Sequence, residues 1–311
     1  MKQLTTQQVE FFEENGYVVV PQVLGSETLS KAQEGYWRML KKCRDGVYSE
    51  FRVENQMSDD HVFGIERIFS PAIYEPAIFQ ASIESSALEF TQQLLGTEEV
   101  FIALNRIHCT NDFSYSGPWH RDGKAGQKDH IQTAIVLYPE RRFFVIPGSH
   151  RCTTDEDSAL TGKLWSRQHF AKQVRLTVNS GDLLLFHSSV LHRGSSVGRG
   201  DQHRAYIHYR IARLDRAQEI SRMMPPEYDR NSLMHGLDAN WDKAFANVSR
   251  ANVPFSVLVQ RPRKQNDLRG LAKKSFYRMA YYALSFLPEN HAFFTERPNF
   301  TPYLRSSGGK S

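Results

Sequence analysis

Cysteine is scarce in this sequence, and its placement excludes several kinds of site. The three cysteines, Cys43, Cys109 and Cys152, lie far apart and match neither a zinc-binding nor a redox spacing. A low and odd number of cysteines is typical of reduced thiols in the cytosol. We therefore expect a cytoplasmic protein without a disulfide framework.

Long apolar runs and concentrated charge are also lacking. No stretch of about 18 consecutive apolar residues occurs, so no transmembrane segment is predicted. The opening residues carry no apolar run after Lys2, and we expect no signal peptide. The formal net charge of +5 comes from scattered basic residues. Because the basic residues are dispersed, a nucleic-acid-binding groove is not expected. The small excess of basic over acidic residues is compatible with an anionic small substrate.

The sequence does contain enough apolar bulk for one large core. Of its 311 residues, 40% are hydrophobic and 12% are aromatic. We expect a single domain over residues 1–305, made of a helical part at 1–97, a β-rich core at 98–213 and a pocket-covering extension at 214–305. Residues 306–311 are small and polar, and they are predicted to form a disordered tail.

The first predicted helix has recognisable signals at both ends. Thr5 and Gln8 match a capping box, and Leu4 and Val9 lie where a hydrophobic staple would form. Gly16 then ends the pattern. The sequence therefore predicts a helix between Thr5 and Gly16.

The pattern changes from helical to strand-like along the chain. Further helices are predicted at 27–44 and 85–95, and strands at 17–20, 99–109, 131–138, 143–146, 174–178, 182–187 and 204–212. Many short strands separated by polar turns indicate a sandwich or barrel rather than a parallel α/β sheet. The region after residue 213 is expected to be irregular and partly helical, and its Trp241, Phe245 and Phe255 either line an apolar pocket or belong to the core.

A basic amphipathic pattern covers residues 268–287. Such a helix can bind an anionic membrane surface. It can also pack on the core and leave its basic face in solvent, and we favour this second interpretation.

The segment 119–123, Trp-His-Arg-Asp-Gly, holds the first candidate metal ligands. Residues two apart in a strand point to the same side, so His120 and Asp122 can place an imidazole beside a carboxylate. About seventy residues later, an apolar strand leads into a turn that can present His192 to the same place. Two imidazoles and one carboxylate leave three coordination positions open, which suits non-haem iron(II). Catalytic zinc also takes three protein ligands, so the ligand set alone leaves zinc open, and His120 by itself also fits a hydrogen-bonded, partly buried histidine.

A basic residue begins the next predicted strand. An arginine there, Arg204, can bind the far end of a dicarboxylate through two parallel hydrogen bonds. Arg210 is an alternative, because residues 204, 206, 208 and 210 would share one face of the strand. Ser195 either adds a hydroxyl to the same carboxylate or is simply a turn serine.

In this order, the motifs resemble the phytanoyl-CoA dioxygenase family of iron(II)/2-oxoglutarate oxygenases. The resemblance covers residues 4–212, and it rests on the opening at 4–20, Trp-His-x-Asp at 119–122, the Pro-Gly-Ser-His turn at 147–150, the strand and turn at 181–192, and Arg204.

The resemblance implies a mainly β fold with flanking helices around a double-stranded β-helix, that is, a jelly-roll, cupin-like core. His120, Asp122 and His192 would bind iron(II). Arg204 and Ser195 would contact 2-oxoglutarate, and dioxygen would be the oxidant. His108 either lies near 2-oxoglutarate or is a structural histidine.

The implied reaction is hydroxylation of a small organic molecule with release of succinate and carbon dioxide. An intact Asp122 favours hydroxylation over halogenation, which needs the position of this carboxylate for a halide. The alternatives are a non-catalytic cupin-like ligand-binding protein and a metal-dependent hydrolase that uses the same ligands. The substrate is expected to be anionic or a specialised metabolite, and the sequence predicts no oligomeric state.

The sequence departs from the family pattern in two places. A turn at residues 138–142, Tyr-Pro-Glu-Arg-Arg, stands where relatives carry an Asn-Gly-rich turn, so we expect an unusual substrate pocket. The spacing from His192 to Arg204 is also slightly longer than in the family pattern. This difference affects the assignment of Ser195 as a 2-oxoglutarate contact more than the assignment of Arg204.

Overall fold

Seven strands form one antiparallel sheet in the order β1-β8-β5-β10-β4-β3-β2. The computed structural model describes residues 2–44, 53–54, 67–69, 75–109, 120–124, 126–152, 173–194, 204–223 and 238–250. Within them the strands of this sheet are β1 (Tyr17–Val20), β2 (Val53–Glu54), β3 (Arg67–Phe69), β4 (Val100–Cys109), β5 (His130–Tyr138), β8 (Leu183–His187) and β10 (Ala205–Arg213).

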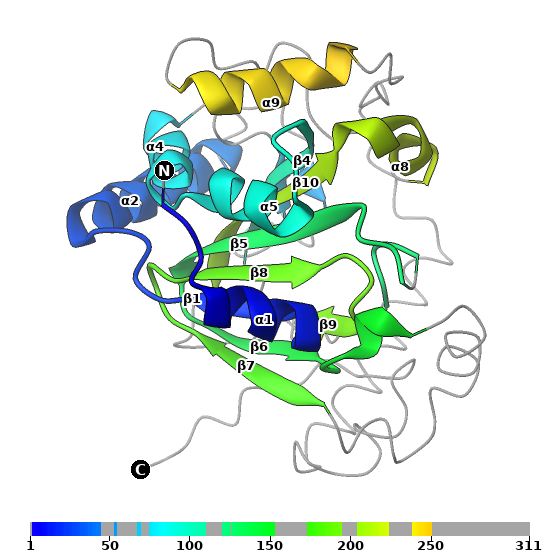
Figure 1. Cartoon of the computed structure of the whole chain (residues 1–311). Coiled ribbons are helices and arrows are strands. Elements are labelled where there is room, and N and C mark those ends of the chain that lie inside the picture. Colours follow the sequence, from blue (N-terminus) through cyan, green and yellow to red (C-terminus); the bar gives the residue numbers. More distant parts are fainter. Residues whose placement is uncertain are drawn as a thin grey trace, which may run out of the picture.

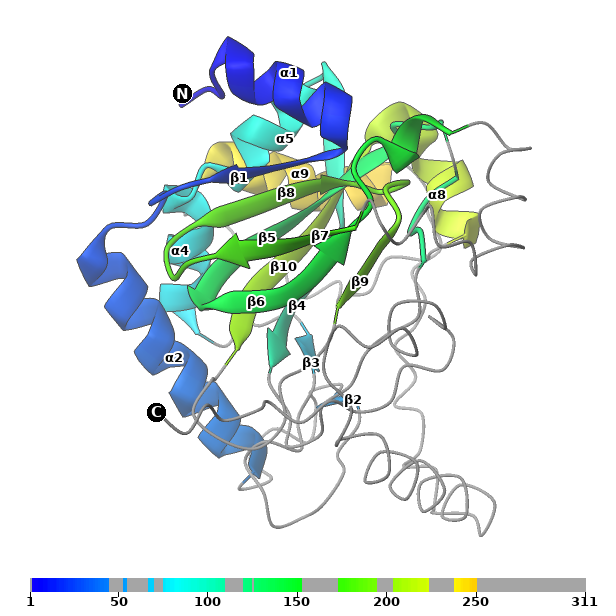
Figure 2. The same cartoon turned by 90° about the horizontal axis from the view of Figure 1, so that it is seen from below.

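A second, three-stranded sheet lies across one face of the first (Figure 2). Its order is β7-β6-β9, with β6 at Glu140–Val145, β7 at Val174–Val178 and β9 at His192–Gly194. Apolar side chains fill the space between the two sheets, among them Val136, Phe143, Val145, Leu184 and Phe186. Two antiparallel sheets face to face are the arrangement expected of a jelly-roll core.

Helices cover the opposite face of the larger sheet (Figure 1). They are α4 (Pro76–Glu84), α5 (Ala87–Leu95) and α9 (Ala239–Arg250); the other helices are α1 (Thr6–Asn15), α2 (Ser26–Arg44), α8 (Ala217–Met223) and the short 3-10 turns η2 (Ser149–Arg151) and η3 (Leu214–Arg216). Because both faces of β5, β8 and β10 are covered, these strands are almost entirely buried.

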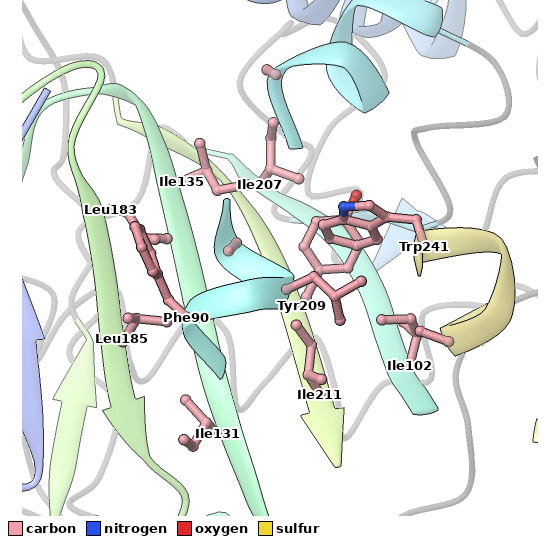
Figure 3. Close-up of a cluster of buried hydrophobic side chains, with 14 of the residues drawn as sticks. Phe90, Ile102, Ile131, Ile135, Leu183, Leu185, Ile207, Tyr209, Ile211 and Trp241 are labelled. Carbon is pink, nitrogen blue, oxygen red and sulfur yellow. The ribbon is translucent and has the colours of Figure 1, made fainter. Parts of the chain in front are cut away.

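The core under the helices is built from the outward residues of these strands (Figure 3). Trp241 of α9 packs against Tyr209 of β10, with 4.8 Å between their ring centroids, and Phe90 of α5 lies near Leu183 and Leu185 of β8. Trp241 and Phe245 are therefore core residues, and Phe255 lies outside the described residues.

The first helix forms as its sequence predicts. The backbone N–H of Gln8 donates to Thr5 Oγ1 over 3.2 Å, and the backbone N–H of Thr5 donates to Gln8 Oε1 over 2.9 Å. Gly16 ends the helix in the left-handed region, with φ 81°. The predicted capping box and helix end are confirmed.

The helix expected at 85–95 is present as α5, Ala87–Leu95. It begins two residues late because Ser86 adopts a φ of 56°, and it follows a separate helix, α4, that was not predicted. One prediction of local structure is wrong. The turn expected at 138–142 belongs to β6 from Glu140 onward, where a register shift between Glu140 and Phe143 admits the extra residues. The turn expected after the apolar strand is present at 188–190, and His192 follows it as the first residue of strand β9.

Some predictions lie outside the described residues: the amphipathic pattern at 268–287 and the tail at 306–311. Among the helices that the structure describes, none is long and apolar enough to cross a lipid bilayer.

Candidate metal centre

Two remote segments of the chain meet to bring the three predicted metal ligands together. His120 and His192 face each other as a pair of extended residues, with each backbone N–H donating to the other's carbonyl over 3.0 and 3.1 Å. The backbone N–H of Asp122 donates to the carbonyl of Ser188 over 2.8 Å. The positions of all three side chains therefore depend on pairing between the segment that begins at 120 and the turn after β8.

The side-chain atoms of these residues are close enough to share one ion. One ligand atom from each of His120, Asp122 and His192 lies within 4.8 Å of the others. Asp122 Oδ1 is 4.0 Å from His120 Nε2, and Asp122 Oδ2 is 3.4 Å from His192 Nε2. Metal–ligand bonds of about 2 Å place neighbouring ligand atoms about 3 to 4 Å apart, so these separations fit a common metal ion.

His192 is held in the tautomer that a metal requires. Its Nδ1–H donates to the carbonyl of Val190 over 3.0 Å, which leaves the lone pair on Nε2 for an ion. The ring lies between Phe143 and Phe186, with centroid separations of 5.4 and 5.0 Å. The side chain of His192 is only 5% exposed, whereas that of His120 is 45% exposed, so the cluster opens to solvent on the side of His120.

Asp122 is an ionised carboxylate at neutral pH. Burial opposes its ionisation, but the interactions with His192 and the electrostatic effects of Arg210 and His120 outweigh it and hold the Asp122 pKa well below the usual range. A carboxylate in this state is ready to bind a divalent cation.

A chain of hydrogen bonds orients Asp122 from behind. Arg106 Nε–H donates to His208 Nδ1 over 3.0 Å, so the remaining proton of a neutral His208 ring is on Nε2 and donates to Gln132 Oε1. The amide of Gln132 in turn donates to Asp122 Oδ2. Gln132 and Arg106 were not predicted; the available signal for Gln132 was a polar residue in a strand whose next apolar run, 134–137, marks it as buried.

Arg204 lies buried at the end of the inward face of β10, where it already has a partner. Its Nε–H donates to the carboxylate of buried Glu140, and its Nη2 donates to the Tyr206 hydroxyl over 3.2 Å. The guanidinium carbon is also 5.1 Å from the centroid of the Tyr206 ring. Glu140 was expected in a turn, so its pairing with Arg204 was not anticipated.

The remaining predicted site residues are His108, Arg210 and Ser195. His108 on β4 stacks on Tyr206 at a centroid distance of 4.8 Å and lies 5.1 Å from His208, so it borders the same interior. Arg210 is buried on the inward face of β10, opposite Gln132 in the strand register. Ser195 lies outside the described residues.

Comparison with known proteins identifies related sequences and folds. The family model described as Phytanoyl-CoA dioxygenase (PhyH) matches residues 12–205. No curated protein matches the chain.

Solved structures share the fold at low sequence identity. EctD from S. alaskensis with 2-oxoglutarate and 5-hydroxyectoine has a TM-score of 0.55 and 19% identity, over 68% of this chain and 77% of that chain. EctD with bound Fe has a TM-score of 0.55 and 18% identity, over 81% and 85% of the two chains. The non-heme alpha ketoglutarate dependent carbocyclase SnoK from nogalamycin biosynthesis has a TM-score of 0.51 and 16% identity, over 68% and 85%. The expected mainly β fold with a jelly-roll core is confirmed.

Proposed function

Because the chain belongs to the phytanoyl-CoA dioxygenase family, we propose that it is a non-haem iron(II)- and 2-oxoglutarate-dependent oxygenase. His120, Asp122 and His192 are the proposed iron ligands, and Arg204 is the proposed partner of the far carboxylate of 2-oxoglutarate. The observation that carries the proposal is the meeting of these three ligand side chains, from two segments remote in sequence, within 4.8 Å.

The donor set fits iron(II). Two imidazole nitrogens and one carboxylate leave coordination positions free for a co-substrate, which a closed structural metal site does not. When bound, iron(II) and 2-oxoglutarate supply dioxygen activation, and the co-substrate leaves as succinate and carbon dioxide. The ligands named for EctD, Fe and 2-oxoglutarate, are consistent with this assignment.

The chain's own residues position the reactants. Gln132 fixes the Asp122 carboxylate, and the phenyl rings of Phe143 and Phe186 fix the His192 imidazole. The apolar side chains between the two sheets exclude water from the interior side of the site.

Arg204 is spaced to reach a co-substrate at the metal. It lies four residues from His208 on one face of the strand, about 13 Å along β10, and His208 contacts Gln132 beside Asp122. An arginine side chain and a five-carbon dicarboxylate together span a gap of this size. We propose hydroxylation of a small organic molecule as the reaction, carried out by a single oxygenase domain within residues 1–305.

Succinate formation tests the proposal. Protein reconstituted with iron(II) in air should convert 2-oxoglutarate to succinate, slowly even without its own substrate. Asp122→Ala and Arg204→Ala should abolish or strongly reduce this conversion. Arg213→Ala, which removes a partly exposed arginine at the far end of the same strand, should leave it unchanged.

The opposite result points to a different function. No succinate, together with no binding of 2-oxoglutarate to the metal-loaded protein, would contradict the oxygenase proposal. A metal-dependent hydrolase or a ligand-binding protein would then be the better assignment.

A further inference from the structure

A second group of polar side chains lies buried beside Asp122. It consists of Arg210 on β10, His130 at the start of β5 and Ser188 just after β8, and we call it the Arg210 cluster. Arg210 is 5% exposed, His130 1% and Ser188 0%. Within the described part of the chain, Nε and Nη1 of Arg210, both ring nitrogens of His130 and the Ser188 hydroxyl have no hydrogen-bond partner.

The backbone places this cluster against the proposed metal ligands. Arg210 lies opposite Gln132 in the β10–β5 register, and Gln132 donates to Asp122. The Ser188 carbonyl accepts the backbone N–H of Asp122, and the Ser188 backbone N–H donates to the His130 carbonyl over 3.4 Å. A molecule held by the cluster would therefore lie beside the metal.

Gly123 packs closely against the cluster. A Cβ atom added at this position would lie 2.7 Å from Ser188 Oγ and 3.4 Å from His130 Cε1. Any other residue would push against the Ser188 hydroxyl. The glycine thus lets the segment that carries Asp122 lie directly against the hydroxyl and the imidazole.

The chemistry of the cluster selects an anion. Burial and the charge of Arg210 lower the His130 pKa to about 3, although Asp122 opposes this, so the ring is neutral and offers one N–H donor. The serine hydroxyl and the guanidinium are also donors. Several unpaired donors around one positive charge are costly to bury, and a carboxylate oxygen pair satisfies them with short, charge-assisted hydrogen bonds.

The charges around the site favour the same conclusion. Arg204 is already paired with buried Glu140, whereas Arg210 forms no ion pair with the residues that the structure describes. Asp122 is ionised and interacts electrostatically with Arg210. Even so, Nε and Nη1 of Arg210 have no carboxylate within hydrogen-bond distance in the described part of the chain.

We propose that the Arg210 cluster is a carboxylate-binding site on the flank of the metal centre. Its occupant is a carboxylate of the reactants, either the metal-binding end of the 2-oxo acid or a carboxylate of the substrate. The assignment to reactants rests on the proposed function. Binding of a carboxylate by the cluster itself does not.

Two calorimetric titrations without oxygen distinguish the two sources. In the first, 2-oxoglutarate is titrated into iron-loaded protein. In the second, acetate is titrated into protein already saturated with iron and 2-oxoglutarate. Wild type is compared with Arg210→Gln and with Arg213→Gln, which removes a partly exposed arginine of the same strand.

We expect Arg210→Gln to weaken binding by about tenfold or more in one of the two titrations, as for the loss of a charge-assisted pair. A loss in the first assigns the site to the co-substrate, and a loss in the second assigns it to the substrate. Arg213→Gln should bind as wild type in both. Unchanged affinities in both titrations would overturn the proposal.

Two further measurements distinguish failure of this proposal from failure of the proposed function and from a purely structural role of Arg210. Wild type that binds neither iron nor 2-oxoglutarate would contradict the proposed function, and acetate titration into the metal-free protein would then still test the cluster. Thermal unfolding of metal-free Arg210→Gln should show an unchanged or raised Tm, because an unpaired buried charge is removed. A lowered Tm with unchanged carboxylate binding would assign Arg210 a structural role and overturn the proposal.

Discussion

At the scale of single residues, Asp122 depends on a partner that touches no metal. Gln132 donates to one of its oxygens and is itself fixed by His208. Partners of this kind orient metal ligands, and their loss usually costs about 10- to 100-fold in metal affinity. We expect Gln132→Leu to weaken iron(II) or cobalt(II) binding by this amount, measured by titration of the metal-free protein.

The neighbouring residue provides the control. Thr133 is also buried but belongs to the opposite face of β5, away from Asp122. Thr133→Val should retain wild-type metal affinity. Equal affinities of Gln132→Leu and wild type would show that Asp122 needs no support from Gln132.

A second prediction concerns the carboxylate that pairs with Arg204. The Glu140 side chain is buried against the Arg204 guanidinium, so its negative charge opposes the approach of a second carboxylate. Glu140→Gln keeps a hydrogen-bond acceptor but removes the charge. We expect 2-oxoglutarate to bind the iron-loaded variant about tenfold more tightly, measured by anaerobic titration.

The same substitution should lower stability in the absence of co-substrate. Breaking a buried ion pair costs about 3 kcal/mol of unfolding free energy. Saturating 2-oxoglutarate should therefore raise the Tm of Glu140→Gln more than that of wild type. Weaker binding of 2-oxoglutarate by the variant would instead mean that Glu140 holds Arg204 in its binding position.

Residues placed by a local sequence pattern could be predicted, whereas residues placed by strand pairing could not. The side-by-side placement of His120 and Asp122 was predicted from strand periodicity, but only His120 is paired as in a strand, and Asp122 lies in a bend held by Ser188. The placement of His192 follows from the apolar strand before it. The pairing of Glu140 with Arg204 could not be predicted, because it depends on a register shift in β6 that no local pattern indicates.

At the scale of elements, the end of α1 is pinned to the turn near the metal centre. Gly16 has a φ of 81°, and its carbonyl accepts the backbone N–H of His187 over 2.8 Å. A Cβ at this position would lie 2.5 Å from His150 Nδ1. Any side chain there would therefore strain the backbone and collide with a buried ring.

A matched pair of substitutions separates these two effects. Gly96 ends α5 with a φ of 66° and open space around it. We expect Gly96→Ala to cost about 1 kcal/mol from backbone strain alone, and Gly16→Ala to cost at least about twice as much. Chemical denaturation measures both, and equal costs would mean that His150 yields without penalty.

Helices and strands differ in how far their own sequence predicts them. The buried strands β5, β8 and β10 were predicted nearly to their ends, because each is rich in apolar residues and bounded by turn residues. Strand β9 has three residues, too few for a periodicity, and it exists because β6 lies beside it. Helix α4 was missed, although Pro76 at its first turn is a start signal.

At the scale of the whole molecule, buried histidines make stability depend on pH. Burial is the largest cause that lowers the pKa of both His130 and His187 to about 3, against an ordinary value of 6.5. Between these values the unfolded chain binds protons that the folded chain cannot, so stability is complete above pH 6.5 and falls as the pH is lowered. From pH 7.5 to 5.0, each histidine should remove about 2 kcal/mol of unfolding free energy.

Urea denaturation of the metal-free protein at the two pH values tests this. Asp122 does not contribute in that range, because its pKa lies below pH 5 in both the folded and the unfolded states. His187→Gln should show a smaller pH dependence than wild type. An unfolding free energy that is the same at pH 7.5 and 5.0 would contradict the burial of neutral imidazoles.

Because β1 pairs with β8, part of the larger sheet cannot form on the ribosome until β8 has been synthesised. Val20 lies opposite Leu183, and β8 leads into the turn before His192. At typical synthesis rates, about 10 to 30 s pass between the emergence of β1 and that of β8. During this time β1 has no strand partner, and the nascent chain has not yet gained His192, the third proposed metal ligand. A complete set of proposed ligands therefore exists only after β8 has been made, and a tag or truncation before Tyr17 would act on an edge of the seven-stranded sheet.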